Sequence, residues 1–316
     1  MQRYIVVRFW QSILALWVMS LIVFCLARVT GNPLDVLLPM EAGPEEYERI
    51  AKHWGLDKPW FIPQDWSQPF DTQYATFMRK ALRGDFGNSL KWQGYTAMNL
   101  VLQRLPATLE LAGIALAISV VLALPIGVLS AAMKDTAFDN GGKLIALLGQ
   151  SLPSFWLAIM LMWIFAVILG WLPTSGRGGF EHMILPAISL GWFQVAALMR
   201  LVRSAMLDVL DSEFVKLARV KGLAEWKVVW KHCLRNAAIA PLTYFSITAG
   251  VLLTGSVVIE SVFAWPGTGL LAVDAVRARD FQVVQAIVIV FAAVFILTNL
   301  LVDILYAYLD PRIRFQ

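Results

Sequence analysis

Long uncharged apolar runs alternate with shorter polar segments along most of this 316-residue chain. Six of these runs match the length that a helix needs to cross the hydrocarbon core of a bilayer, about 20 residues. They occupy residues 9–27, 111–133, 144–169, 183–199, 237–259 and 281–302. An even number of spans returns the chain to the side where it began, so both termini are expected on one side of the membrane.

The pattern predicts an all-α, polytopic membrane protein with six transmembrane helices, because helices satisfy every backbone polar group inside lipid. Residues 1–29 begin with basic side chains, as a signal peptide does, but the apolar run is too long and no small-residue cleavage site follows. We therefore expect a retained anchor helix there. Residues 30–104 are predicted to form an extracytoplasmic loop, and residues 105–316 a five-helix core with a loop at 204–235.

Composition and charge agree with a membrane location. Hydrophobic residues make up 59% of the chain, charged residues 15%, and the mean hydropathy is +0.66, whereas soluble domains are about 25% charged. Eight Lys and Arg lie between Arg200 and Arg235, while the short loops on the other side hold three. Because cytoplasmic loops carry the excess of positive charge, this loop and both termini are predicted to be cytoplasmic, and the net charge of +4 does not indicate a nucleic-acid partner.

The sequence offers no catalytic or cofactor motif. It lacks H-E-x-x-H, C-x-x-C and G-x-S-x-G, and its three histidines fall in three different loops. The Gly141–Gly142–Lys143 stretch has Ala137 where a phosphate loop needs glycine and Leu144 where it needs Ser or Thr, so we interpret it as a flexible cytoplasmic turn. The chain is expected to bind no metal, ATP or other cofactor and to catalyse no reaction.

Ionisable residues are placed near the ends of the predicted spans. Glu110, Glu260 and Asp303 each lie within about a turn of an end, and the central parts of the spans hold only neutral polar groups. Ion-coupled carriers usually need an ionisable group near the middle of the membrane. This distribution disfavours an ion- or proton-coupled secondary transporter, which is one alternative of a different class; a membrane-anchored scaffold is another.

Residues 213–241 concentrate basic charge and predict two short helices. Asp211, Ser212 and Glu213 suit a helix start and Gly222 a helix end. In the second helix, apolar side chains recur at helical spacing: Trp226, Val229, Trp230, Cys233 and Leu234. This face is expected to bury against lipid, a partner protein or the ends of the chain's own spans. A DNA-binding helix-turn-helix is excluded, because membrane spans begin and end within a few residues of it.

The same stretch resembles the EAA motif of binding-protein-dependent ABC importer permeases. The residues that carry the resemblance are Glu213, Ala218, Arg219, Lys221, Gly222, Leu223, His232, Arg235, Asn236, Ala237 and Pro241. One position departs from the family, since Leu217 stands where a second Ala or Gly is often found. Four further motifs are similar to the first permease subunit of the dipeptide, oligopeptide and nickel group: RGDFGNSL at 83–90, LPTSG at 172–176, ESVFAWPGTG at 260–269 and NLLVDILYAYLDPRIR at 299–314.

This resemblance implies a type I importer-like permease in a bacterial inner membrane, whose cytoplasmic loop docks a coupling helix on a separate ATPase. The residues implied in ATPase coupling are Glu213, Ala218, Arg219, Lys221, Gly222, Leu223, His232 and Arg235. Those implied at the outer gate and the binding-protein side are Gly84, Asp85, Phe86, Gly87, Trp265, Pro266 and Gly267.

The implied partners are a second, homologous permease, two ATP-binding subunits that use ATP and Mg, a periplasmic or lipid-anchored substrate-binding protein, and membrane lipid. Small peptides are the favoured substrate class. The same architecture would also suit nickel, glutathione or an opine-like compound, because permeases of this group look alike whichever solute the binding protein selects.

Overall fold

The computed structural model describes residues 2–29, 43–63, 67 and 70–309. Parts of the 30–104 segment and the end of the 299–314 motif therefore lie outside the described residues. Within the described part, helices dominate, and the only strand-like pairing is an isolated antiparallel bridge between Asn88 and Thr96. The predicted all-α fold is confirmed.

Four helices in the described part are long and apolar enough to cross a membrane, and two bent pairs raise the number to six if each pair counts as one span. The four single helices are α1 (Gln2–Val29), α5 (Ala97–Ala132), α8 (Glu181–Leu210) and α14 (Phe281–Leu309). The bent spans are α6 (Ala137–Ser151) with α7 (Ser154–Leu161) and η1 (Met162–Ile168), and α12 (Ile239–Val262). The shorter helices are α3 (Pro44–Trp54), α4 (Gln73–Ala81), α9 (Glu213–Val220), α10 (Glu225–Lys227), η2 (Val228–Cys233), α11 (Leu234–Ala237) and α13 (Thr268–Arg277).

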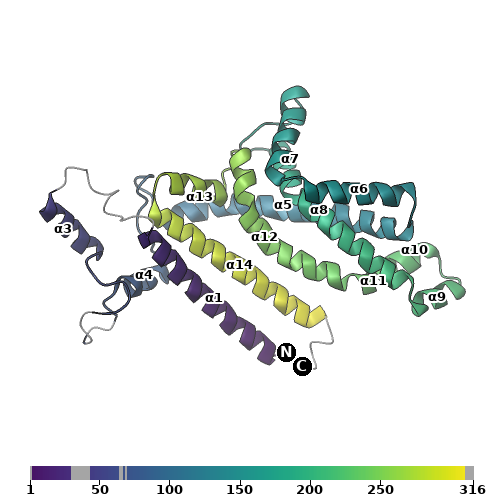
Figure 1. The fold of residues 1–316 in the computed structure, drawn as a ribbon, viewed down its shortest axis with the longest axis horizontal. Coiled ribbons are helices and arrows are strands. Elements are labelled where there is room, and N and C mark those ends of the chain that lie inside the picture. Colours follow the sequence, from purple (N-terminus) through teal and green to yellow (C-terminus); the bar gives the residue numbers. More distant parts are fainter. Residues whose placement is uncertain (1, 30–42, 64–66, 68–69, 310–316) are drawn as a thin grey trace. The chain divides into compact units, whose positions relative to one another are not determined.

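The third predicted span is broken where a single helix was expected. α6 and α7 meet at an angle of 107°, a sharp turn that is visible in Figure 1. Leu152 and Pro153 both adopt extended backbone angles at the junction. Proline lacks an N–H and disfavours helical angles in the residue before it, so it ends one helix and begins the next.

The Gly141–Gly142–Lys143 stretch is not the flexible turn that the sequence predicted. It lies inside α6, whose first turn is capped by the Thr136 hydroxyl accepting a hydrogen bond from the Asp139 amide. A threonine cap stabilises a helix start by about 1 kcal/mol, which offsets part of the cost of two interior glycines. The prediction was wrong because it weighed the glycines and not the cap.

The chain forms two compact units, of which the second comprises Ala107–Leu270 and a short C-terminal segment. In this unit α8 is the central helix and packs against α6, α7, α11 and α12 (Figure 1). Its approach to α5 is close at Gly191, where a Cβ atom would lie 2.8 Å from the Ala115 carbonyl oxygen. Small residues at such crossings bring helices together in membranes.

The first unit comprises Met1–Pro106 and Leu271–Asp303, with a short C-terminal segment. Its core contains apolar residues from the RGDFGNSL motif and from α5, α13 and α14: Phe86, Ala97, Leu100, Val101, Leu271, Ala275, Val283, Ala286 and Ile287. Helix α1 is tied to α4 by two polar contacts, Ser20 Oγ to Tyr74 Oη at 2.8 Å and Arg28 Nε to Gln73 Oε1 at 2.9 Å.

Candidate functional site

The first helix of the loop, α9, begins after Ser212, which has the extended backbone of a helix cap. The Ser212 hydroxyl does not cap α9 but donates to the Val209 carbonyl oxygen at 2.5 Å. Val215 is fully buried in the core of the second unit. Glu213 is exposed and pairs with Lys216 at 2.8 Å on the outer side of the helix. α9 is therefore anchored by one buried valine while its outer surface stays accessible.

Gly222 ends α9 in the left-handed region, with φ of +75°. The Gly222 amide donates to the Arg219 carbonyl at 2.9 Å and the Leu223 amide to the Ala218 carbonyl at 3.3 Å, the two bonds of a Schellman motif. No atom lies within 4 Å of the position that a Cβ of residue 222 would take. Glycine is thus favoured here by the backbone conformation and not by lack of space.

The second segment differs from the regular α-helix that the sequence predicted, because residues 228–233 form the π-helix η2. A π-helix turns less per residue than an α-helix, so the apolar stripe is redistributed. Val229 and Cys233 are buried against the second unit's own helices, together with Val228. Trp226 and Trp230 remain exposed. The ends of the chain's own spans therefore cover only part of the predicted face.

The loop presents an exposed apolar surface, which we call the docking surface. It consists of Phe214, Leu217, Val220, Leu223, Trp226 and Trp230. Val220 is the most exposed of these side chains, at 84%. Large apolar side chains that are exposed together on one loop are typical of an interaction site, and aromatic residues are enriched at the centres of such sites.

An ion pair links the two helices of the loop. The Arg219 guanidinium donates to the Glu225 carboxylate through Nη2 at 2.7 Å and Nε at 3.2 Å. This pair raises the pKa of Arg219 and lowers the pKa of Glu225. Burial raises the pKa of the Cys233 thiol, which keeps that thiol protonated and unreactive. Among the described residues, no cluster of His, Cys, Asp and Glu is suited to a metal ion.

The predicted coupling residues fall into two groups. Ala218, Arg219, Gly222 and Leu223 meet at the turn, whereas the exposed Arg235 lies on α11. Lys221 is also exposed at the turn, and His232 contributes its carbonyl oxygen to an Asn236 side-chain bond at 2.8 Å. Sequence reasoning did not single out Glu225. The sequence did contain an indication of the ion pair, because Glu225 lies six positions after Arg219 on the other side of a helix-ending glycine.

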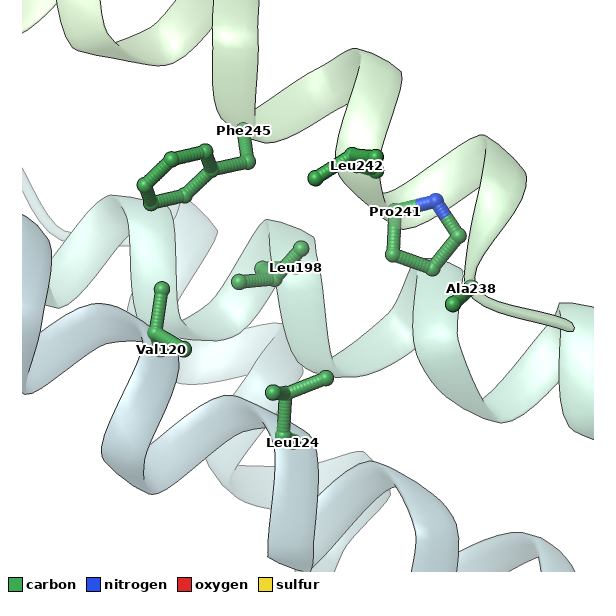
Figure 2. A pocket seen from close by; sticks show the side chains of 7 residues that line it. All are labelled: Val120, Leu124, Leu198, Ala238, Pro241, Leu242 and Phe245. Atoms are coloured by element: carbon green, nitrogen blue, oxygen red, sulfur yellow. The ribbon is translucent and has the colours of Figure 1, made fainter. Parts of the chain in front are cut away.

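The loop joins the membrane helix α12 next to an apolar cavity of about 210 Å³. Figure 2 shows Val120 and Leu124 from α5 and Leu198 from α8 facing the start of α12. The other lining residues are Ala238, Pro241, Leu242 and Phe245. Because the joint is not close-packed, the first turns of α12 have space into which they can move.

The predicted gate residues near the N-terminus belong to the first unit. Gly84 and Gly87 have φ of +72° and +86°, and between them the Asp85 carboxylate accepts the Gly87 amide at 3.0 Å. Phe86 is buried in the core of the unit. Just beyond, the buried Asp280 carboxylate accepts hydrogen bonds from two groups of the same motif, the Ser89 hydroxyl and the Leu90 amide, and from the Lys91 amide that follows the motif.

The other predicted gate residues, Trp265, Pro266 and Gly267, belong to the second unit. Trp265 is fully buried and its indole N–H donates to the Ala107 carbonyl at 2.9 Å. At Gly267, a Cβ atom would lie 2.4 Å from a Glu260 carboxylate oxygen.

The Glu260 carboxylate is fully buried beside Gly267. It accepts hydrogen bonds from Thr108 at 2.8 Å, Ser256 at 2.9 Å and the Leu270 amide at 3.0 Å. This network fixes the chain that follows α12.

Comparison with known proteins identifies a family and several relatives that this chain resembles. Residues 123–315 match the family described as binding-protein-dependent transport system inner membrane component. The dipeptide transport system permease protein DppB of Alkalihalophilus pseudofirmus is 34% identical over 94% of this chain and 95% of its own. The oligopeptide transport system permease protein AppB of Bacillus subtilis is 33% identical, and the glutathione transport system permease protein GsiC of an Escherichia coli strain 36% identical, each over 100% of both chains.

A similar fold occurs among solved structures. The MetNI methionine ABC transporter in an inward-facing conformation matches with a TM-score of 0.58 and 18% identity, over 67% of this chain and 97% of the other. At that level of identity the likeness concerns the fold alone.

Proposed function

Because the chain belongs to the family of binding-protein-dependent transport system inner membrane components, we propose that it moves small peptides through the membrane as the first permease subunit of an ATP-driven importer. As a family member it is a multi-pass membrane permease and not itself an enzyme. The energy of transport comes from ATPase partners, and the solute from a binding protein. Peptide is the substrate class because relatives that match over nearly the whole chain are named for dipeptides and oligopeptides.

The docking surface is the observation that carries the coupling proposal. It leaves six large apolar side chains exposed on a loop otherwise rich in Lys and Arg. Such a surface is costly in water and is stabilised when a partner covers it. We assign that cover to an ATPase subunit, which faces the permease from the cytoplasm.

The coupling residues then have distinct roles. Glu213 and Ala218 lie on the docking helix α9, and Gly222 with Leu223 sets the angle of the segment that follows. Arg219 holds that angle through Glu225, and is therefore engaged within the loop. Lys221 and Arg235 are exposed and available to ATPase carboxylates or lipid phosphates, and His232 belongs to the segment that leads into α12.

The proposal extends to the other subunits of the transporter and to the orientation of this chain in the membrane. A second, homologous permease completes the translocation path, two ATP-binding subunits contact the two loops, and a periplasmic or lipid-anchored binding protein docks outside. The excess of Lys and Arg in the 204–235 loop supports a cytoplasmic location for that loop and for both termini in a bacterial cell.

The outer gate is proposed to involve both motifs named for it. In the first unit, Gly84–Gly87 lead into a segment held by the Asp280 carboxylate. In the second unit, the Trp265–Gly267 turn is held by Glu260 and by the Trp265 indole. Each motif is rigidly supported by its own unit, which suits a surface that a binding protein must recognise repeatedly.

Glutathione is a second candidate substrate. The GsiC relative of Pectobacterium atrosepticum, named for glutathione transport, is 38% identical over 100% of both chains. Glutathione is itself a small peptide, so the two candidates call for the same kind of path. Uptake of labelled dipeptide, oligopeptide and glutathione by proteoliposomes, with each cognate binding protein in turn, distinguishes them.

A matched pair of variants tests the docking role. Val220→Glu places a charge on the docking surface, while Leu82→Glu places one at a similarly exposed position, 80%, in the first unit. We expect Val220→Glu to lose the ATPase subunits during purification and to lose transport, and Leu82→Glu to retain both. Equal retention of the ATPase by the two variants would contradict the proposal.

A further inference from the structure

A cavity of about 420 Å³ lies between α5, α6 and α8 in the second unit, on the side where the loop emerges. Its walls combine cationic, hydroxyl and apolar groups. The lining residues are Ser130, Gly142, Lys143, Ala146, Leu147, Met199, Arg200 and Arg203. None of them belongs to the predicted coupling or gate residues.

The positive charge of this cavity is only partly compensated. Arg203 Nε lies 2.6 Å from Asp139 Oδ1 and Lys143 Nζ lies 2.9 Å from Asp139 Oδ2, so one buried carboxylate serves two cations. Asp135 adds a weaker contact to Lys143 at 3.7 Å. Arg200 also lines the cavity, and its guanidinium has no ion pair or hydrogen bond within the described residues. An anion that enters the cavity therefore meets a free guanidinium.

Ser130 provides a second, independent indication of a ligand. Its side chain is 1% exposed, and its hydroxyl has no hydrogen-bond partner in the part of the chain that the structure describes. Ser119 and Ser189 are also buried in membrane helices, yet each donates to the carbonyl four residues earlier, at 2.7 Å. Buried hydroxyls are almost always satisfied, so the unpaired Ser130 hydroxyl is available to a group that occupies the cavity.

The absence of a side chain at Gly142 leaves room for the Ser130 hydroxyl. A Cβ atom at this position would lie 2.7 Å from Ser130 Oγ, so any other residue would displace the hydroxyl. The glycine that resembled part of a phosphate loop thus leaves room for a polar atom inside a helical wall.

We propose that this cavity binds the phosphate group of an anionic phospholipid from the cytoplasmic leaflet. Arg200 and the Ser130 hydroxyl donate to the phosphate oxygens, and Lys143 and Arg203 add positive potential. Basic pockets between membrane helices on the cytoplasmic side are suited to anionic headgroups.

The surroundings favour a lipid over the acidic side chain of a protein partner. Leu147 is part of the cavity wall and is 62% exposed, and Leu144 and Leu148 are exposed along the same helix. An acyl chain would cover these leucines, whereas a solvated carboxylate would not. The proposal goes beyond the transport function and depends only on the chain lying in a membrane.

Native mass spectrometry of the complete transporter, titrated with phosphatidylglycerol or with phosphatidylcholine, tests the proposal. We expect selective binding of phosphatidylglycerol that Arg200→Gln weakens about tenfold, the scale of one lost charge-assisted hydrogen bond. Ser130→Ala should weaken it by a smaller factor. The matched control is Lys134→Gln, because Lys134 is exposed in the turn between α5 and α6 and does not line the cavity.

Each other outcome argues against the site. Equal lipid binding by Arg200→Gln and Lys134→Gln overturns it. Displacement of phosphatidylglycerol by millimolar inorganic phosphate assigns the cavity to free phosphate instead of lipid. Binding that appears only after the ATPase subunits are removed assigns the cavity to a protein partner. Since the readout is bound lipid, a failure of peptide transport leaves this result unaffected.

Discussion

Arg219 and Glu225 form an ion pair across the Gly222 turn, with Nη2 and Oε1 2.7 Å apart. A Schellman motif closes the same turn through the backbone. The two connections hold α9 and the following segment at one angle before any partner binds. A loop that is already held in one conformation loses little conformational entropy when a partner binds it, and it transmits displacement better than a flexible loop does.

Replacing Gly222 with valine is expected to abolish transport while leaving the spans assembled. A β-branched residue at φ of +75° costs about 1–2 kcal/mol or more, so the turn changes and the docking helix shifts. Gly222→Asn is the control, because asparagine tolerates the left-handed region and no atom crowds its Cβ. The measurements are peptide uptake and stimulation of ATPase activity by the liganded binding protein. Normal stimulation in Gly222→Val would contradict a coupling role for this turn.

Acidification is expected to loosen the loop through Glu225. Arg219 lowers the folded-state pKa of Glu225, so the pair stabilises the loop above the ordinary glutamate pKa, about 4.3, and that contribution is lost as the pH falls through the lower, folded-state value. Both side chains are about half exposed, so the effect is small, about 0.2–1 kcal/mol.

Hydrogen exchange of residues 213–227, corrected for intrinsic rates, measures the loosening between pH 3 and 7. In Arg219→Gln the loop should already exchange faster at pH 7 and lose most of its dependence on pH. Lys216→Gln removes an exposed pair within the same helix and serves as the control. An unchanged pH profile in Arg219→Gln would show that the pair does not hold the turn.

Cysteine labelling tests the predicted topology. Leu82→Cys and Lys227→Cys place exposed thiols in the segment before α5 and in the loop. With Cys25 and Cys233 replaced, a membrane-impermeant maleimide added to intact spheroplasts should label residue 82 and not residue 227. Labelling of both from outside would reverse the assignment of the loop to the cytoplasm.

The Asp280 carboxylate is expected to stabilise the RGDFGNSL segment. It is fully buried and accepts the Leu90 amide at 2.9 Å and the Lys91 amide at 3.1 Å. Asp280→Asn removes the negative charge and turns an acceptor oxygen into an NH₂ group, so at least one of these donors loses its acceptor. The expected loss of stability is about 1–3 kcal/mol. Limited proteolysis near residues 82–96 should become faster, whereas Asp57→Asn, at an exposed position, should have no effect. Equal cleavage rates would mean that the segment is held by other contacts.

The length of the apolar runs predicted six spans because lipid imposes a minimum apolar length on each helix, and the described part holds four such helices, or six if each bent pair is one span. It located the ends poorly, since α5 begins at Ala97 and α8 continues to Leu210, well beyond their uncharged runs. Helices project past the hydrocarbon core wherever capping and packing sustain them. The break at Pro153 was not predicted, because residues 144–169 were interpreted as one span, although a proline within an apolar run is a local indication of a break.

Sequence reasoning predicted the part of the site where the backbone conformation requires a particular residue. It did not predict the part where packing against distant residues determines the conformation. Gly222 was identified because a helix-ending turn strongly favours glycine. The π-helix at Val228–Cys233 was missed, since no local pattern distinguishes it from an α-helix and its burial depends on distant residues. The sequence around Trp265 likewise did not indicate that its indole N–H would donate to the distant Ala107 carbonyl oxygen.

The continuity of α8 has a mechanical consequence. Its one proline, Pro186, lies near the Glu181 end, so the stretch from Pro186 to Leu210 is about 37 Å of uninterrupted helix. Rotating such a stiff rod by about 10° at the end beside the docking surface swings the opposite end by about 6 Å. That displacement approaches the width of an extended peptide backbone with small side chains. A rotation of about 10° at the loop end of α8 is therefore large enough to displace its far end by a distance on the scale of a small peptide.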